Sequence, residues 1–400
     1  MCLSRPSTAK TGQVPRQGPP RIVLFVECPA MGEIYGLGEI TCPSGELVIV
    51  DGGHLGMWSG EGSPALVDPG AFGVQEPSVA ADVAAATDFE ITGPDAETAA
   101  HSFDRQPGRT LHDIPASGVA RLTELFDAHC REHGLDAGLE ACAERVPHRE
   151  RVRRCTKQGG GCFLMHGVPV VTLGGVPRDR PLPVLATDTG IVVPFAPSPL
   201  ARSPSSFAPP AVVLSPADPC PSGLSPAGPS DAGPSPAVKS VELGEVRVDW
   251  ARLLFGDADA LSAWRHDEPV DGLADVAFWG ASEEAAAAEF AAPGLGEPGE
   301  NGVKGWTGLS MPDAMRLAGA LFDWKDADPR RRLMVDFRPH SHHWQIMREV
   351  RASALEAGTV EVGGARVLCA MTGQGDGRLP VSAELDPTGR PVAVRVSFPG

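Results

Sequence analysis

The feature that most constrains the fold of this chain is a proline-rich stretch near its middle. Residues 194–238 contain 13 prolines among 45 residues, interleaved with serine, alanine and glycine. This composition cannot bury enough apolar surface to offset the entropy of ordering the backbone. We therefore expect a disordered, semi-extended linker or insertion between two globular segments. The alternative, docking of its Pro-x-x-Pro pieces on a partner's aromatic groove, lacks usefully placed basic flanking residues.

The rest of the chain divides into a polar N-terminus and two segments that can each form a core. Residues 1–20 have almost no apolar side chains and should be disordered. A start of translation at Met31 is an open alternative. The first globular segment covers residues 21–193. The second covers residues 239–400 and holds six of the seven tryptophans. With 42% hydrophobic residues, each segment has enough apolar material for a core.

Hydrophobic periodicity and turn residues predict a mixture of helices and strands in both segments. The expected elements of the first segment are a buried strand at 46–50, a helix from about 118 to Gly134 capped by Ser117, a charged helix at about 136–154, and strands at 162–165 and 168–173, the second at a sheet edge because of Pro169. The second segment should contain strands at 241–248, 275–279 and 333–337, a short helix capped by Asp257, helices at 283–291 and 311–325 (with Met315, Leu317, Leu321 and Phe322 facing inward) and a helix starting at Ser341, followed by strands at 359–362, 366–371, 379–385 and 392–398.

These elements predict an α+β fold: two mixed α/β lobes with a C-terminal antiparallel β-meander, interrupted by the linker. An open alternative is one α+β fold in which the linker is an insertion. In that arrangement Ser44–Asp51 and the terminal hairpin share a sheet. No internal repeat with a period of 20–50 residues is visible.

The charge and the cysteines exclude several classes of protein. The chain has a net charge of −17, spread evenly: 16 Lys and Arg against 24 Asp and Glu before Val193, and 17 against 25 from Lys239 onward. A nucleic-acid partner or an anionic membrane surface needs a basic footprint, so neither is expected. The nine cysteines are odd in number and irregularly spaced, and no apolar run is long enough for a signal peptide or a membrane span. We therefore expect reduced thiols and a cytoplasmic location.

The most suggestive residues for chemistry lie in the stretch 336–344. If the backbone stays extended, Asp336, Arg338, His340 and His342 point to one side. Two histidines in a His-x-His pattern can bind one divalent metal, which makes His340 and His342 candidate metal ligands and Arg338 a candidate binding residue. Further ligands could come from Asp376, Glu349 or His266. The alternative is a helix entry in which these side chains bond to loop carbonyls.

A second candidate is the glycine-rich loop 372–378, which lies between two predicted strands. Gly375 permits close backbone approach, and Arg378 beside Asp376 could bind an anion. The alternative is a long hairpin loop without a ligand. Weaker candidates are Asp51 with His54 at a glycine turn, and a histidine pair, 129 and 133, on one helix face. Nucleophile-elbow, dinucleotide-binding and zinc-protease motifs are absent, and the sequence leaves any cofactor unknown.

Three stretches resemble uncharacterised proteins of high-GC actinobacteria, which form a bacterial domain family of unknown function. They are residues 44–51, residues 336–344, and the ending 375–381 with 386–394. The resemblance implies no activity, because none is assigned to that family.

Three functions remain open on this basis. The first is a non-enzymatic binding or interaction protein of the cytoplasm, regulatory or immunity-like, whose partner would be another protein. The second is a metal-dependent enzyme that uses His340 and His342. The third is a small-molecule binding module at the interface of the two lobes, with the glycine-rich loop at its rim. The sequence does not determine the oligomeric state.

Overall fold

The computed structural model describes residues 34–68, 77–103, 108–195, 239–296, 303–373 and 375–398. The predicted disordered N-terminus, the alternative start at Met31 and nearly all of the predicted linker lie outside these ranges. Of the linker, Pro194 ends a strand and Phe195 is buried in a core. The described residues combine helices with antiparallel sheets, which confirms the predicted α+β class.

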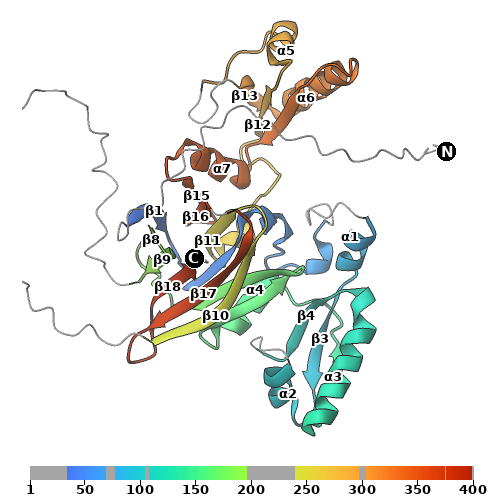
Figure 1. Cartoon of the computed structure of the whole chain (residues 1–400), viewed down its shortest axis with the longest axis vertical. Helices are drawn as coiled ribbons and strands as arrows, with labels where there is room; N and C mark the ends of the chain where they lie inside the picture. The colour runs from blue at the N-terminus through green and yellow to red at the C-terminus, as the bar shows by residue number, and fades with distance from the viewer. Residues whose placement is uncertain are drawn as a thin grey trace, which may run out of the picture.

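Two six-stranded antiparallel sheets, which we call sheet A and sheet B, form the centre of the molecule (Figure 1). Sheet A has the order β1-β8-β9-β18-β17-β10, with strands at Tyr35–Ile40 (β1), Leu182–Thr187 (β8), Gly190–Pro194 (β9), Lys239–Val248 (β10), Gly377–Leu385 (β17) and Pro391–Ser397 (β18). Sheet B has the order β15-β16-β11-β2-β7-β6, with strands at Glu46–Asp51 (β2), Gly160–Met165 (β6), Val168–Gly174 (β7), Arg252–Asp257 (β11), Ala357–Val362 (β15) and Ala365–Met371 (β16).

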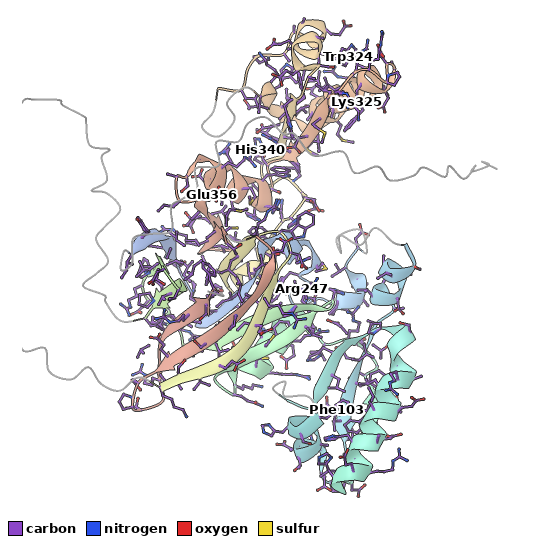
Figure 2. All side chains as sticks on the ribbon, viewed as in Figure 1. Phe103, Arg247, Trp324, Lys325, His340 and Glu356 are labelled. Carbon is purple, nitrogen blue, oxygen red and sulfur yellow. The ribbon has the colours of Figure 1, made fainter. Side chains whose placement is uncertain are left out.

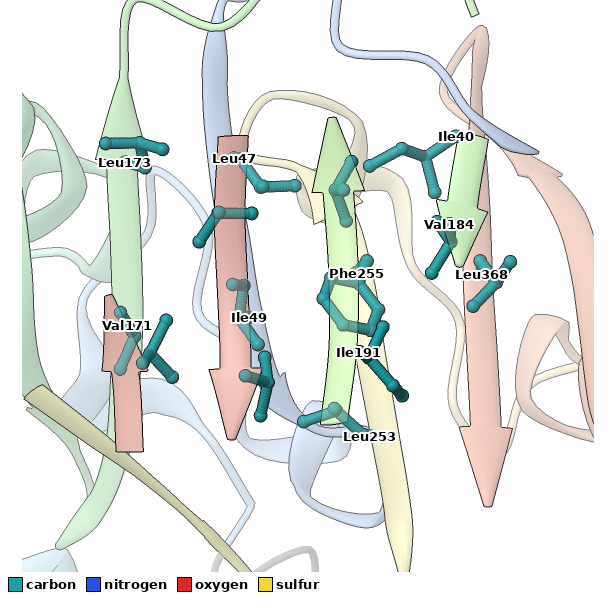
Figure 3. Packing of buried hydrophobic residues seen from close by; sticks show 14 of the residues in the cluster. Ile40, Leu47, Ile49, Val171, Leu173, Val184, Ile191, Leu253, Phe255 and Leu368 are labelled. Atoms are coloured by element: carbon teal, nitrogen blue, oxygen red, sulfur yellow. The ribbon is translucent and has the colours of Figure 1, made fainter. Parts of the chain in front are cut away.

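The core of the molecule lies between the two sheets, and β2 shows how the sequence builds it. Leu47 and Ile49 point into this shared core together with Phe255 of β11 (Figure 3). Val48 and Val50 point the other way, into a second core on the outer face of sheet B. Because both faces of the strand are covered, all of these side chains are fully buried, and β2 reads as an unbroken apolar run.

Two helices cover the outer face of sheet B: α4 (His148–Thr156) and α7 (His342–Ala352). Val152 of α4 and Ile346 of α7 belong to the second core. The shorter elements are a helix at Pro77–Ala84 (α1) and 3-10 helices at Gly52–Met57 (η1), Pro64–Leu66 (η2), Ala116–Gly118 (η4) and Ala260–Ala263 (η6). No helix within the described ranges is long and apolar enough to cross a membrane.

Two small α/β units, each with its own core, project from the sheets at opposite ends of the molecule (Figure 1). The first unit consists of β3 (Thr87–Thr92), α2 (Ala96–Phe103), β4 (Thr110–Ile114), α3 (Val119–His133) and β5 (Gly138–Ala141). The second unit consists of β12 (Leu273–Trp279), α5 (Glu283–Phe290), β13 (Lys304–Ser310), α6 (Met311–Asp326) and β14 (Met334–Pro339). Their antiparallel sheets have the equivalent orders β4-β3-β5 and β13-β12-β14.

The order of elements shows that the fold is an internal duplication. The described parts of residues 34–195, the first repeat, and of 239–398, the second repeat, each contain two strands, a 3-10 helix, a βαβαβ unit, a helix and four strands. Equivalent strands β9 and β18 pair at the centre of sheet A, and equivalent strands β2 and β11 pair at the centre of sheet B. On the two sides of each centre the remaining strands follow in equivalent order: β8 and β1 correspond to β17 and β10 in sheet A, and β7 and β6 correspond to β16 and β15 in sheet B. An approximate twofold axis therefore relates the repeats.

Residue-level features support the duplication. The pattern Leu-x3-Asp-x3-Leu-x2-Trp occurs at positions 47–58 and again at 253–264. Trp58 packs against His148, the first residue of α4, with ring centroids 5.7 Å apart. Trp264 packs in the same way against His342, the first residue of α7, also at 5.7 Å. The two halves are therefore built on one plan, whose period exceeds the 20–50 residues typical of short repeats.

Several predicted elements are confirmed. They include the strand at β2, the helix α3 that ends at Gly134 in a left-handed conformation, the helix α5, and the helix α7, whose cap Ser341 accepts the N–H of Trp344. The four C-terminal strands are antiparallel and form two hairpins: β15 and β16 belong to sheet B with β2, whereas β17 and β18 belong to sheet A. Both sheets thus contain strands from both predicted segments.

Other local predictions are wrong. The helix expected at 136–154 is instead β5 followed by α4, because Pro147 interrupts the helical pattern. Ser117 bonds to Asp82 and does not cap α3. The strand with Pro169 is interior, since β7 pairs with both β2 and β6, but its pairing with β2 begins only at Val171.

On α6 the orientation also differs from the prediction. Leu321 is buried, but Met315 and Phe322 are exposed, because small residues, Ala314 and Ala318, face the sheet.

Candidate functional site

The structure separates the two histidines that the sequence placed on one side. Asp336 and Arg338 do share a face of β14, where the Arg338 Nε donates to Asp336 Oδ2 at 2.7 Å. The chain then turns at Ser341 into α7. His340 contacts the loop and strand of the second α/β unit, whereas His342 Nδ1 accepts the N–H of Arg265 at 2.9 Å. Among the described residues, no group of three His, Cys, Asp or Glu side chains could hold a metal ion.

His340 lies between two carboxylates. Its Nδ1 is 2.9 Å from Asp271 Oδ2, and its Nε2 is 2.8 Å from Asp275 Oδ1. A neutral imidazole has only one N–H, so both contacts are donated hydrogen bonds only when the ring is an imidazolium. Burial lowers the pKa of His340, but the hydrogen bonds to Asp275 and Asp271 outweigh it and leave this pKa raised.

The two carboxylates are held in place by backbone groups. Asp275 lies on β12 beside Arg338 of β14, and its Oδ1 also accepts the N–H of Gly308 at 2.8 Å. Asp271 precedes β12, and its Oδ1 accepts the N–H of Leu273 at 2.9 Å. Burial raises the pKa of Asp271, but the hydrogen bonds from His340 and Leu273 outweigh it and leave the pKa below its ordinary value. Both carboxylates are therefore engaged within the protein.

A pocket of about 270 Å³ opens beside His340, between α7 and the second α/β unit (Figure 2 shows His340 between these two parts). Its lining residues come from the loop before β12, from β12, from the end of β14 and from α7: Asp271, Asp275, Arg338, His340, Trp344, Gln345, Arg348 and Arg351. The indole of Trp344 has the guanidinium groups of Arg338 and Arg351 at 5.6 Å and 5.7 Å from its ring centroid. These cation–π contacts orient two of the three arginines.

The electrostatics of this pocket, which we call the His340 pocket, favour an anion. Three guanidinium groups line it; that of Arg338 is paired with Asp336, and the two carboxylates that line the pocket both bind His340. Arginine remains charged at every physiological pH, and its planar fork matches the two oxygens of a carboxylate or a phosphate. Arg348 is exposed and forms no ion pair within the described part of the chain. The pocket is therefore suited to bind a small negatively charged group.

A larger hollow of about 620 Å³ lies in the first repeat, at the end of α4, but its charges are mostly satisfied internally. Arg149, the most buried of its basic residues, pairs with both Glu46 and Asp259. Arg178 donates to the carbonyl oxygen of Ser44. This hollow is therefore a weaker candidate for an anion than the His340 pocket.

The glycine-rich loop between β16 and β17 lies away from the His340 pocket. Gly375, Asp376 and Arg378 do not line it. Arg378 is exposed and lies 3.7 Å from Glu245 of the neighbouring strand β10, and the carbonyl of Gly375 accepts from Thr372 Oγ1. The loop crosses from β16 of sheet B to β17 of sheet A, and these two strands do not pair, so the long hairpin loop that the sequence allowed here is wrong.

The remaining candidates are also dispersed. His266 stacks on His343 with centroids 4.3 Å apart, and Glu349 is exposed on α7. His129 and His133 lie side by side on α3, and His129 Nε2 contacts Ser102 Oγ. None of them joins His340.

Sequence reasoning identified Arg338 and His340 but missed the rest of the pocket. Trp344, Arg348 and Arg351 occupy one face of α7 at helical spacing, a signal that the helix starting at Ser341 already contained. Asp271 and Asp275 carried no local signal, because they reach His340 only through the pairing of β12 with β14.

Comparisons with known proteins add no further assignment: no protein-family model, no curated protein sequence and no solved structure matches this chain.

Proposed function

We propose that this protein binds a small anionic ligand, bearing a carboxylate or a phosphate group, in the His340 pocket. The observation that carries the proposal is the charge balance of this pocket. Arg348 lines it, is exposed and forms no ion pair within the described residues, while the two carboxylates of the pocket are both bound to His340. A ligand anion would complete the charge balance through charge-assisted hydrogen bonds.

Binding explains the arrangement of His340 better than catalysis does. A general base needs a ring nitrogen that can accept a proton from the substrate. Both nitrogens of His340 are engaged by Asp271 and Asp275, so the ring acts as a cationic link that fixes the loop before β12 to β14. Among the functions that the sequence left open, this favours the third, a small-molecule binding module, over the metal-dependent enzyme.

We also propose a cytoplasmic location. The described cysteines are all free thiols, namely Cys42, Cys130, Cys142, Cys155, Cys162 and Cys369. Free buried thiols are typical of proteins in a reducing compartment.

Isothermal titration calorimetry with succinate and with inorganic phosphate tests the binding proposal. The wild-type protein should bind at least one of them, and Arg348→Ala should bind it about tenfold more weakly, a loss of about 1.4 kcal/mol. Arg316→Ala is the matched control, because Arg316 is an exposed arginine on α6 outside the pocket. A concentration of about 10 mM saturates a site with a millimolar Kd. If neither succinate nor phosphate binds at this concentration, the proposal is refuted.

A further inference from the structure

The duplication allows the His340 pocket to be compared with the same position in the first repeat. Asp88 on β3 is the equivalent of Asp275 on β12. Each lies where the pairing with the next strand shifts register by one residue, and each accepts the N–H of the bulged residue opposite at 2.8 Å. The bulged residue is Asp113 in the first repeat and Gly308 in the second, with φ values of 56° and 64°. Asp113 and Gly308 are therefore equivalent positions.

In the first repeat the side chain of Asp113 lies in a buried cluster with Asp88, Arg145 and Arg151. The carboxylate is almost fully buried and pairs with Arg145 and Arg151. It also accepts the backbone N–H of His166. Burial raises the pKa of Asp113, but Arg151 and Arg145 outweigh it and hold this pKa far below its ordinary value. The protein thus carries its own anion here, paired with two guanidinium groups.

The helices that follow differ in a matching way. Arg151, the fourth residue of α4, bridges Asp88 and Asp113 and has no exposed surface. The fourth residue of α7 is Gln345, which lines the His340 pocket. The second repeat therefore lacks both the internal carboxylate and its main partner. The His340 pocket, which Asp275 and Gln345 line, is found there instead; Gly308 is not one of its lining residues but donates its N–H to Asp275, which is.

We infer that the His340 pocket is a carboxylate site, in which the carboxylate of the ligand takes the place that Asp113 occupies in the first repeat. This inference rests on the proposed function and specifies the ligand class. A planar two-oxygen group matches both the internal anion of the first repeat and the fork of an arginine. It follows that the protein binds one ligand per chain, in the second repeat only, and prefers succinate to phosphate.

Replacing Gly308 by aspartate tests this inference, because it restores the internal anion. The geometry permits the substitution: a Cβ at Gly308 meets no atom within 4 Å, and aspartate already adopts this backbone conformation at Asp113. The neutral control is Gly308→Asn, which has the same shape and tolerates the same φ. If Gly308→Asp fails to fold, Gln345→Glu supplies an isosteric carboxylate from α7.

Calorimetry and thermal unfolding of the full chain give distinct outcomes. We expect succinate to bind the wild type and Gly308→Asn with a stoichiometry of one, at least tenfold more tightly than phosphate. Binding to Gly308→Asp and to Gln345→Glu should be weakened at least tenfold. Without ligand, Gly308→Asp should unfold at a higher temperature than Gly308→Asn.

Equal binding of succinate and phosphate, or unchanged succinate binding in Gly308→Asp, would overturn the carboxylate assignment while leaving anion binding intact. If neither anion bound the wild type, the proposed function would fail. In that case, a higher unfolding temperature of Gly308→Asp than of Gly308→Asn would still support a position for an anion beside Asp275. A lower one would refute it.

Discussion

Asp51 and Asp257 are equivalent carboxylates in the two repeats, and each accepts hydrogen bonds from the backbone of the opposite repeat. Asp51 Oδ2 accepts the N–H groups of Asp249 and Trp250, at 2.7 Å and 3.0 Å. Asp257 Oδ2 accepts the N–H of Ser44 at 2.7 Å. The other oxygen of each binds the start of the 3-10 helix that follows its own strand. These reciprocal contacts fix the pairing of β2 with β11 at the centre of sheet B.

Removing one of these carboxylates should destabilise the whole fold. Asp51 is fully buried and accepts three backbone N–H groups. Each donor left unsatisfied costs about 1–3 kcal/mol, so Asp51→Ala should lower the free energy of unfolding by at least about 3 kcal/mol in urea denaturation. Asp323→Ala, at an exposed position of α6, should change it by less than about 0.5 kcal/mol. Equal unfolding midpoints for the two variants would contradict the role of Asp51.

Each sheet consists of three strands from one repeat beside three from the other, which predicts the behaviour of the separated halves. Residues 1–195 and 239–400, expressed alone, should each expose the strand that pairs with the other half, β2 or β11 in sheet B and β9 or β18 in sheet A. We expect each half to be poorly folded by near-ultraviolet circular dichroism and prone to aggregate. Co-expression should yield a stable one-to-one complex. Two halves that are each monomeric and cooperatively folded would show that they are independent domains.

Two arginines on equivalent helices should separate stability from function. Arg151→Met leaves Asp88 and Asp113 without their shared cation in a closed site, and should cost about 3–5 kcal/mol of unfolding free energy. Arg348→Met on α7 removes an exposed side chain of the His340 pocket, so stability should change by less than about 0.5 kcal/mol while anion binding weakens. Thermal unfolding and calorimetry measure the two effects. A stability loss at Arg348 as large as at Arg151 would contradict the distinction between closed and open sites.

The ion pairs of His340 predict a defined pH dependence. The pKa of His340 is raised above the 6.5 of the unfolded chain, so its stabilising contribution is complete below pH 6.5 and is lost as the pH rises through the folded pKa. The pKa of Asp271 is lowered, so its contribution is present above its unfolded value of 3.8 and is lost as the pH falls through the folded value. The link between these side chains is therefore strongest between the two titrations.

Unfolding temperatures of the wild type and His340→Gln check this dependence. Their difference should be largest just below pH 6.5 and should shrink as the pH rises above 6.5 through the raised pKa of His340. His101→Gln, at an exposed histidine of α2, should parallel the wild type throughout. A difference between wild type and His340→Gln that stays constant with pH would mean that the imidazolium does not link Asp271 and Asp275.

Much of the local structure follows from nearby residues. The β2 strand is predictable because four consecutive apolar residues meet two covered faces, and α3 ends at Gly134 because glycine adopts the left-handed conformation without strain. The exposed Met315 and Phe322 were not predictable from α6 itself, because the alanines opposite them determine which face packs on the sheet.

The candidate site divides in the same way. The elements around it follow from local sequence: a strand carrying Arg338, a turn at Ser341, and a helix with arginines on one face. The contacts of His340 with Asp271 and Asp275, and the correspondence of Gly308 with Asp113, depend on how the chain folds in three dimensions. The difference comes from how far apart the interacting residues lie in the sequence. Helix caps and strand periodicity depend on residues a few positions apart, whereas ion pairs and strand partners depend on backbone pairings between distant segments, such as β12 with β14 in the second α/β unit and β2 with β11 between the repeats.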